Sequence, residues 1–285
     1  MPKVMVLTDS TAYIPPELSA GLPIITIPLH IHWGSEHFLD AIDITPAEFY
    51  RRLATSDIMP TTSQATPEDF KSVFERLLSQ GYHVLGIFLS SKLTATIYSA
   101  IQASTGFPEG TIELMDSLTG AMATGFQVLV AARAAAQGAV LAECRSLAER
   151  ARQNTDILFA VGTLEFLRRG GRIGAATALL GTVLQFKPIL TVKDGIIAPL
   201  ERVRTMKNAV ERLIELMETR IAGRTPIHLA VMHSNLPDAA RDLLERIRQR
   251  LGENKIAEGV ISDISPAIGT HIGPGAVGVA YLAGM

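Results

Sequence analysis

The sequence of 285 residues has almost no cysteine and no marked excess of charge. Its one cysteine, Cys144, cannot form a disulfide bond within the chain, so a reducing, cytoplasmic setting fits best. Lys and Arg number 26 and Asp and Glu 28, which gives a net charge of −2. A nucleic-acid-binding protein usually carries a basic excess, so we expect no nucleic acid among the partners.

Several enzyme signatures are also missing. The chain contains no G-x-x-x-x-G-K-[ST] phosphate loop, no G-x-S-x-G nucleophile elbow and no H-E-x-x-H zinc motif. His30 and His32 lie two apart on an expected strand and face the same side, but no third ligand is indicated. A solvated strand face is therefore favoured over half a metal site, and we expect neither a metal nor a cofactor.

Long hydrophobic runs and a signal peptide are absent as well. The first residues enter a strand-like run without an apolar segment followed by a small-residue cleavage site. Residues 264–285 contain no Asp, Glu, Lys or Arg, yet their many glycines, Pro266 and Pro274 argue against a spanning helix. We expect a soluble protein without stable membrane insertion.

What the chain does contain is an alternation of apolar strands and helices. It is 47% apolar and 19% charged, as a folded globular protein is. Runs that read as buried strands occupy residues 3–9, 23–29, 83–89, 111–116, 156–161, 187–192, 227–233 and 255–262. Helical patterns separate most of them, and this order predicts an α/β fold with mainly parallel sheets.

Local signals place some boundaries within this order. Thr45 and Thr66 each begin a capping box with proline at the first helical position, and residues 30–40 read as a hairpin. The helical stretch at about 118–154 contains no strand and forms a plausible seam. We predict two α/β domains, residues 1–155 and 156–285.

Polar loops lie where ligands of α/β sheets usually bind. Hydroxyl-rich stretches occur at residues 8–11, 61–64, 90–96 and 232–235, and the second is bracketed by prolines without a clear preceding strand. They favour a site that binds through hydrogen bonds. Asp9 reads equally as a catalytic group or as a helix cap, whereas the cap is favoured for Asp116.

Ser91 and His271 allow three interpretations. Ser91 could be a nucleophile with His271 as its general base, or a capping residue of the helix that follows. A third interpretation, which we prefer, is that this helix N-terminus binds an anion. The literal G-x-G-x-x-G at residues 273–278 is not a dinucleotide loop, because no acidic residue follows it.

The segment RRGGRIG is the sharpest basic feature. Its paired glycines permit a tight turn, from which Arg168, Arg169 and Arg172 would project. Such a loop could hold a phosphate group or an acidic partner surface, with a solvated turn as the alternative. Arg202 and Arg204 of ERVRT add two guanidinium groups, one of which could point into a site.

Taken in order, several motifs resemble those of the DegV family across nearly the whole chain. They are TDST, PTTSQATPEDF, SSKLTATIYSA, DS at 116, TLEFLRRGGRIG, LLGTVLQFKPIL, DGIIAPLERVRT and GTHIGPGAVGVAY. The resemblance implies two α/β domains that enclose a long-chain fatty acid. It further implies that a separate ATP-binding fatty acid kinase subunit phosphorylates the carboxylate, giving acyl phosphate for phospholipid synthesis.

The resemblance also assigns residues. Its motifs imply that the carboxylate is bound by Thr62, Ser63, Ser91, Arg204 and His271. Arg168, Arg169 and Arg172 would lie near the phosphate-facing or kinase-docking side. The chain departs from the family pattern at Thr94-Ala95, where Ser-Gly is usual, and at Phe186.

The physical requirements agree with a lipid carrier that has no catalysis of its own. A fatty acid needs an apolar tunnel with a few convergent polar groups, and its buried carboxylate needs charge pairing and hydrogen bonds. Two alternatives stay open at this point. One is a hydrolase that uses Ser91 and His271, and the other is a phosphate- or nucleotide-binding protein that uses the arginine loop.

Overall fold

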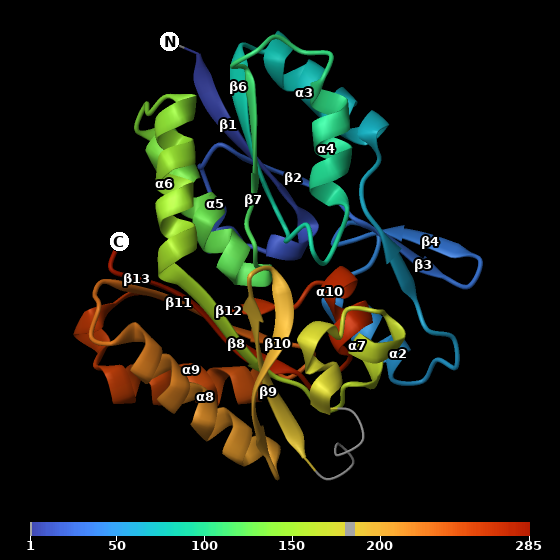
Figure 1. Cartoon of the computed structure of the whole chain (residues 1–285), viewed down its shortest axis with the longest axis vertical. Helices are drawn as coiled ribbons and strands as arrows, with labels where there is room; N and C mark the ends of the chain where they lie inside the picture. The colour runs from blue at the N-terminus through green and yellow to red at the C-terminus, as the bar shows by residue number, and fades with distance from the viewer. Residues whose placement is uncertain (1, 180–185) are drawn as a thin grey trace.

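The computed structural model describes residues 2–179 and 186–285. Most of the sequence motif LLGTVLQFKPIL that precedes Phe186 lies outside the described residues. The remaining motifs are all described. The described residues form two large sheets and one small one (Figure 1).

The first large sheet is parallel and is covered on both faces. Its strand order is β2 (Ile24–Ile27), β1 (Lys3–Asp9), β6 (Tyr82–Phe88) and β7 (Ile112–Asp116). Helices α3 (Pro67–Ser79) and α4 (Thr96–Ser104) pack on one face. Helices α5 (Ala121–Ala136) and α6 (Leu141–Asn154) pack on the other. Two covered faces explain why these strands read as uninterrupted apolar runs.

The second large sheet has six strands and is mixed. Its order is β10 (Ile196–Val203), β9 (Lys187–Lys193), β8 (Thr155–Ala160), β13 (Val277–Ala283), β11 (Ile227–His233) and β12 (Ile256–Asp263). Only β11 and β12 pair in parallel. Helices α8 (Met206–Ile221) and α9 (Pro237–Leu251) cover one face, and α5 lies against the other.

The α/β class is therefore confirmed, but mainly parallel pairing holds only for the first sheet. In the second sheet, β9 and β10 are joined by Asp194 and Gly195, both with positive φ, and so short a turn connects antiparallel strands. Strand β13 then enters antiparallel between β8 and β11. Neither feature is encoded in the alternation of strands and helices.

The small sheet extends the N-terminal part of the chain. It consists of β4 (Glu36–Leu39), β3 (His30–Trp33) and β5 (Thr61–Ser63), so the predicted hairpin is confirmed. The stretch at 61–64 was expected to be a loop, but Thr61–Ser63 pairs with β3 as a short strand. Both predicted capping boxes are present, at the starts of α2 (Pro46–Leu53) and α3.

The C-terminal helix α10 (Pro266–Ile272) packs against α2 and the small sheet. Tyr50 Oη donates a hydrogen bond to the carbonyl of Ile264 at 3.0 Å, and the N–H of Ala267 donates to Asp40 Oδ1 at 3.1 Å. Helix α7 (Glu165–Arg169) lies beside α10 (Figure 1). The chain thus returns at its end to structure built from its first 65 residues.

Four short helical segments complete the described fold. They are η1 (Ser10–Ala12), α1 (Pro16–Ser19), η2 (Gly174–Leu179) and η4 (Glu253–Lys255). Helix α6 ends at Asn154 and β8 begins at Thr155, beside the predicted boundary, and the division into two domains stays a prediction. Within the described ranges, no helix combines the length and apolar character needed to cross a bilayer.

The packing of α10 against α2 predicts a cost for a side chain at Gly269. A Cβ there would lie 2.6 Å from Tyr50 Oη and 2.8 Å from a ring carbon of Phe49. Overpacking costs about 1–3 kcal/mol, and alanine recovers about 1 kcal/mol of helix propensity. Gly269→Ala should therefore lower the free energy of unfolding by about 1 kcal/mol, measured from urea midpoints.

The matched control is Gly106→Ala, because nothing lies within 4 Å of a Cβ at that position. It should leave the midpoint nearly unchanged. Equal midpoints for the two variants would show that α10 does not pack against α2 as closely as described.

Candidate functional site

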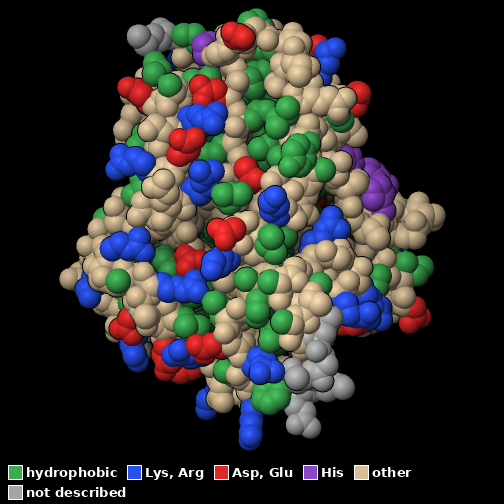
Figure 2. All heavy atoms as spheres, viewed as in Figure 1, with side chains coloured by type: hydrophobic (Ala, Val, Ile, Leu, Met, Phe, Trp, Pro, Cys, Tyr) green, Lys and Arg blue, Asp and Glu red, His purple; other side chains and the backbone are tan. Residues whose placement is uncertain are grey.

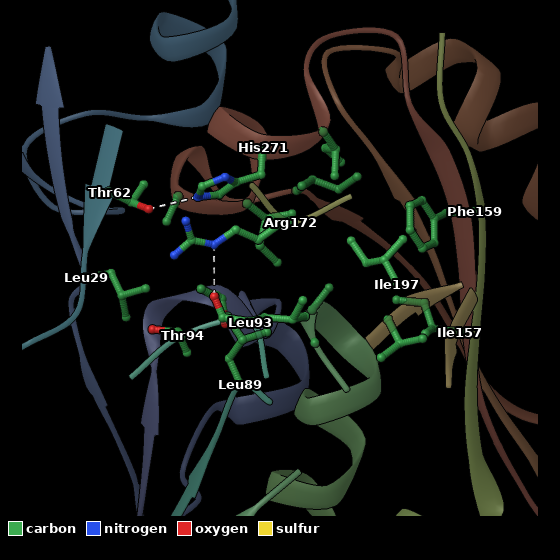
Figure 3. A pocket seen from close by; sticks show the side chains of 18 of the residues that line it. Leu29, Thr62, Leu89, Leu93, Thr94, Ile157, Phe159, Arg172, Ile197 and His271 are labelled. Atoms are coloured by element: carbon green, nitrogen blue, oxygen red, sulfur yellow. Dashed lines mark hydrogen bonds between the residues drawn. The ribbon is translucent and has the colours of Figure 1, made fainter. Parts of the chain in front are cut away.

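A cavity lies between the parallel sheet and the mixed sheet, and its two ends differ in character. It contains about 920 Å³ of empty space, its open mouth included. Ile157 and Phe159 of β8, Ile197 of β10 and Met232 of β11 form an apolar end. Polar side chains gather at the other end, toward the small sheet (Figure 3).

The polar end brings together residues that lie far apart in the sequence. Thr62 of β5 and His271 of α10 share a hydrogen bond of 2.9 Å between Oγ1 and Nε2. The Arg172 side chain enters beside them; its Nε donates to the carbonyl of Leu93 at 3.1 Å and its Nη1 donates to that of Gly170 at 2.8 Å. Figure 3 shows the guanidinium group and the imidazole facing the same space. Thr94 adds a hydroxyl group to this lining.

His271 is electrically neutral near neutral pH. Burial, and then the positive charge of Arg172, lowers the pKa of its imidazole to about 4. Its Nδ1 is buried and has no hydrogen-bond partner. The polar end therefore carries one positive charge, on Arg172, beside a neutral imidazole and two threonine hydroxyl groups.

The paired glycines of the arginine loop have a specific structural reason. A Cβ at Gly170 would lie only 2.3 Å from Nδ1 of His271, so only glycine lets the loop approach the ring so closely. Gly171 has a φ of +69°, which also favours glycine. The loop thereby brings Arg172 into the cavity and places His271 against its backbone.

The three arginines of the segment RRGGRIG do not all point toward the cavity. Arg168 and Arg169 both form ion pairs with Glu165, at 2.8 Å and 2.6 Å, and remain about half exposed. Arg172 alone of the three lines the cavity. Arg168, Arg169 and Arg172 were expected near one phosphate-facing or docking surface. In the structure, Arg172 lies in the cavity, away from Arg168 and Arg169.

The five residues expected to bind a carboxylate do not all meet. Thr62, Ser63 and His271 line the cavity, whereas Ser91 and Arg204 are not among its lining residues. The backbone N–H of Ser91 donates to the Asp116 carboxylate at 3.2 Å, and Arg204 is exposed just after β10.

Thr94 and Arg172 occupy the cavity instead. Thr94 belongs to the same motif as Ser91, SSKLTATIYSA, and Arg172 belongs to the segment RRGGRIG. Sequence could find these motifs, but loop residues lack the periodicity that would tell which of their side chains turns inward.

Ser63 connects the cavity wall to a histidine cluster on the hairpin. Its Oγ hydrogen-bonds to His32 Nε2 at 2.9 Å, and His30 Nδ1 lies 2.8 Å from His37 Nε2. His37 was not expected beside these histidines, and β4 brings it opposite His32. Among residues 2–179 and 186–285, no group of three or more His, Cys, Asp or Glu residues could hold a metal ion.

Asp9 and Asp116, which were considered for acid–base chemistry, both accept hydrogen bonds from backbone N–H groups. Asp9 is fully buried, accepts hydrogen bonds from the N–H groups of Thr11 and Leu89, and has its pKa raised by burial. Asp116 accepts from the N–H groups of Ser91 and Leu118. Asp9 is the N-cap of η1, which agrees with the capping interpretation, whereas Asp116 binds the backbone of two loops and is not the N-cap of α4 or α5.

The glycines near the C-terminus also serve close packing. Gly273 ends α10 with a φ of +74°, and a Cβ there would lie 2.3 Å from the ring of Phe166. A Cβ at Gly278 would lie 2.7 Å from Cβ of Phe159 on the adjacent strand. This agrees with the expectation that the glycines allow close backbone approach.

Comparison with known proteins places these features in a family. A family model described as "Uncharacterised protein, DegV family" matches residues 3–284. A DegV domain-containing protein of Halalkalibacterium halodurans is 36% identical over 284 residues, covering 99% of each chain.

Solved structures give the same result. A DegV family protein from Thermus thermophilus, described as fatty-acid-binding, has 33% identity and a TM-score of 0.90, covering 99% of each chain. DegV of Bacillus subtilis, described as a fatty acid binding protein, has 31% identity and the same TM-score, covering 99% of this chain and all of that one.

Substitution of His271 should remove a pH-dependent loss of stability. Its folded-state pKa is about 4, whereas an unfolded histidine has a pKa of about 6.5, so the unfolded state takes up the proton first. The contribution of His271 to the free energy of unfolding should be fully present above about pH 6.5 and should decrease as the pH falls toward about 4. Between about pH 7.5 and about pH 4.5 the decrease should be smaller by about 2 kcal/mol in His271→Gln than in the parent protein.

Urea unfolding at the two pH values measures this difference, and NMR titration of the His271 ring protons should give a midpoint near the same low pKa. An equal decrease in both proteins, or a midpoint at the ordinary histidine value, would contradict a buried, neutral His271.

Proposed function

The chain belongs to the DegV family, and from that membership and the cavity geometry we propose that it binds a long-chain fatty acid. The acyl chain would lie against the apolar end, and the carboxylate would lie beside Arg172, Thr62, Thr94 and His271. Relatives of 31% and 33% identity with the same fold are described as fatty-acid-binding proteins, which supports this assignment.

One observation carries the proposal: Arg172 brings a positive charge into a cavity whose other described lining residues are uncharged near neutral pH. No Asp or Glu is among the described residues that line the cavity, and Arg172 donates hydrogen bonds to the neutral backbone carbonyls of Leu93 and Gly170. An uncompensated charge in such a place is costly unless an anion pairs with it. A carboxylate of single negative charge matches Arg172 beside a neutral His271.

The apolar walls would supply most of the affinity. Side chains from four strands of the mixed sheet and from Leu89 and Leu93 line the space beyond the polar end. Each methylene group transferred there from water contributes about 0.8 kcal/mol, so a long acyl chain binds more tightly than a short one.

We further propose that the protein presents the carboxylate to a separate ATP-dependent fatty acid kinase subunit. A carboxylate oxygen would attack the γ-phosphorus of ATP, giving acyl phosphate and ADP, and the acyl phosphate would serve phospholipid synthesis. Arg168 and Arg169, exposed in the last turn of α7 just before the loop that carries Arg172, would face that partner. This role requires the cytoplasmic location expected from the sequence.

The structure favours neither alternative function. Ser91 does not line the cavity, and the hydrogen bond of the His271 ring is to Thr62. A hydrolase mechanism would need contact between Ser91 and His271. A phosphate site on the arginine loop would need Arg168 and Arg169 to leave Glu165.

Removing the charge of Arg172 should weaken fatty acid binding. Organic extraction and mass spectrometry of the purified protein should recover near-stoichiometric long-chain fatty acid, and the delipidated protein should rebind palmitate or oleate. Arg172→Gln should lower that affinity about 10- to 100-fold, because the buried carboxylate loses its charged partner.

Arg204→Gln is the matched control, since Arg204 is exposed and lies outside the cavity lining. It should bind fatty acid like the parent protein. Absence of any acyl species together with failure to rebind added fatty acid would overturn the proposal, and a larger loss in Arg204→Gln would move the carboxylate site.

The kinase step predicts charge-sensitive docking at the arginine loop. With ATP and a cognate kinase subunit, loaded protein should yield acyl phosphate, which hydroxylamine traps for mass spectrometry. The double variant Arg168→Glu, Arg169→Glu should slow this reaction about tenfold or more without changing fatty acid affinity, because rim charges act mainly on association.

The control reverses two exposed arginines of α9, Arg241→Glu and Arg250→Glu, and should keep the parent rate. Equal rates in both double variants would remove the loop from the docking surface. Failure to form acyl phosphate with intact fatty acid binding would overturn the kinase role alone.

A further inference from the structure

A second cleft lies on the other side of the segment that walls the fatty-acid cavity. Asp263 lines the cleft, and the next residue, Ile264, lines the cavity. The cleft contains about 1270 Å³ of empty space including its mouth, between the ends of β1, β2 and β12 and the η1–α1 connection. None of the functions proposed above uses it.

Every charged residue in the described lining of this cleft is acidic. They are Glu17, Asp40 and Asp263. Asp40 is 0% exposed and accepts hydrogen bonds from Ser10 Oγ at 2.6 Å and from the N–H of Ala267. The Asp263 side chain is 46% exposed.

Among residues 2–179 and 186–285, Asp263 forms no ion pair with Lys or Arg. The group within ion-pair distance is His233, whose Nδ1 lies 3.5 Å away. Burial lowers the pKa of His233, so its imidazole is neutral near neutral pH. The described lining of the cleft is thus negatively charged near neutral pH.

A threonine whose buried hydroxyl group has no hydrogen-bond partner also lines the cleft. Thr8 is 1% exposed, and its Oγ1 has no hydrogen-bond partner among the described residues. Thr8 pairs in register with Thr26 of the neighbouring parallel strand, and Val6 with Ile24, so these side chains share one face of the sheet. Thr26 and Ile24 line the cleft together with Thr8, which places the Thr8 side chain on the cleft side of the sheet.

We propose that this cleft binds a small organic ammonium ion carried on a short apolar body. The ammonium group donates up to three hydrogen bonds, and the carboxylates and the Thr8 oxygen offer acceptors for them. The Tyr13 ring and the side chains of Ile24 and Ile261 contact the apolar body, and the ring adds cation–π attraction. The acidic lining repels carboxylate and phosphate ligands.

A bare metal ion fits this cleft less well than an organic cation. In the part of the chain that is described, no group of three or more His, Cys, Asp or Glu residues could hold a metal. Both oxygens of Asp40 already accept hydrogen bonds, and much of the wall is aliphatic. Aliphatic walls pack against the carbon skeleton of an amine, but they have no atoms that can coordinate a metal ion.

Calorimetric titration of the full chain with phenethylammonium chloride tests this proposal. Saturable binding at one site is expected, and the neutral analogue 2-phenylethanol should bind at least about tenfold more weakly, since it lacks the charge. Asp263→Asn should weaken amine binding about tenfold. Asp238→Asn, which removes an exposed carboxylate on α9, should leave amine binding unchanged.

A second variant guards against loss by misfolding. Thr8→Val keeps the side-chain shape and breaks no protein hydrogen bond, so it should keep the melting temperature while weakening amine binding about threefold or more. Equal affinity for the amine and the alcohol, or equal effects of Asp263→Asn and Asp238→Asn, would overturn the proposal. These results do not depend on whether the main cavity binds a fatty acid.

Discussion

The hydrogen bond between Thr62 and His271 joins residues 209 positions apart, and the polar end of the cavity depends on it. It can form only where α10 is held against the small sheet, through Asp40 to Ala267 and Tyr50 to Ile264. Gly170 then lets the arginine loop pack on the histidine ring. The site is therefore a product of docking between distant segments, and no single motif contains it.

The two hollows on either side of residues 263–268 carry charges of opposite sign. The main cavity has Arg172 as the charged group of its described lining, whereas the charged residues in the described lining of the cleft behind residues 263–268 are all acidic. Asp40 does not line the main cavity, because its carboxylate oxygens accept hydrogen bonds from Ser10 and from the backbone of α10. If the two proposed ligands bind, the opposite charges of these two sites would let each site recognise a ligand that the other repels.

Sequence predicted the features that local physics determines. The capping boxes at Thr45 and Thr66 and the hairpin at 30–40 depend on residues within a few positions of one another, and all are present. The mixed second sheet could not be predicted, because the place of β13 is set by tertiary packing. Likewise, the choice of Arg172 over Arg204 as the cavity-lining arginine depends on loop direction, which leaves no periodic signal.

Strand β13 has a consequence for the order of folding. It lies between β8 and β11, so both of these inner strands lack a partner on one side until residues 277–283 have been synthesised and inserted. The parallel sheet uses only strands that end by Asp116 and can assemble much earlier. During translation the chain therefore passes through a stage with a formed first sheet and unpaired apolar edges in the second, which is when it is most exposed to aggregation.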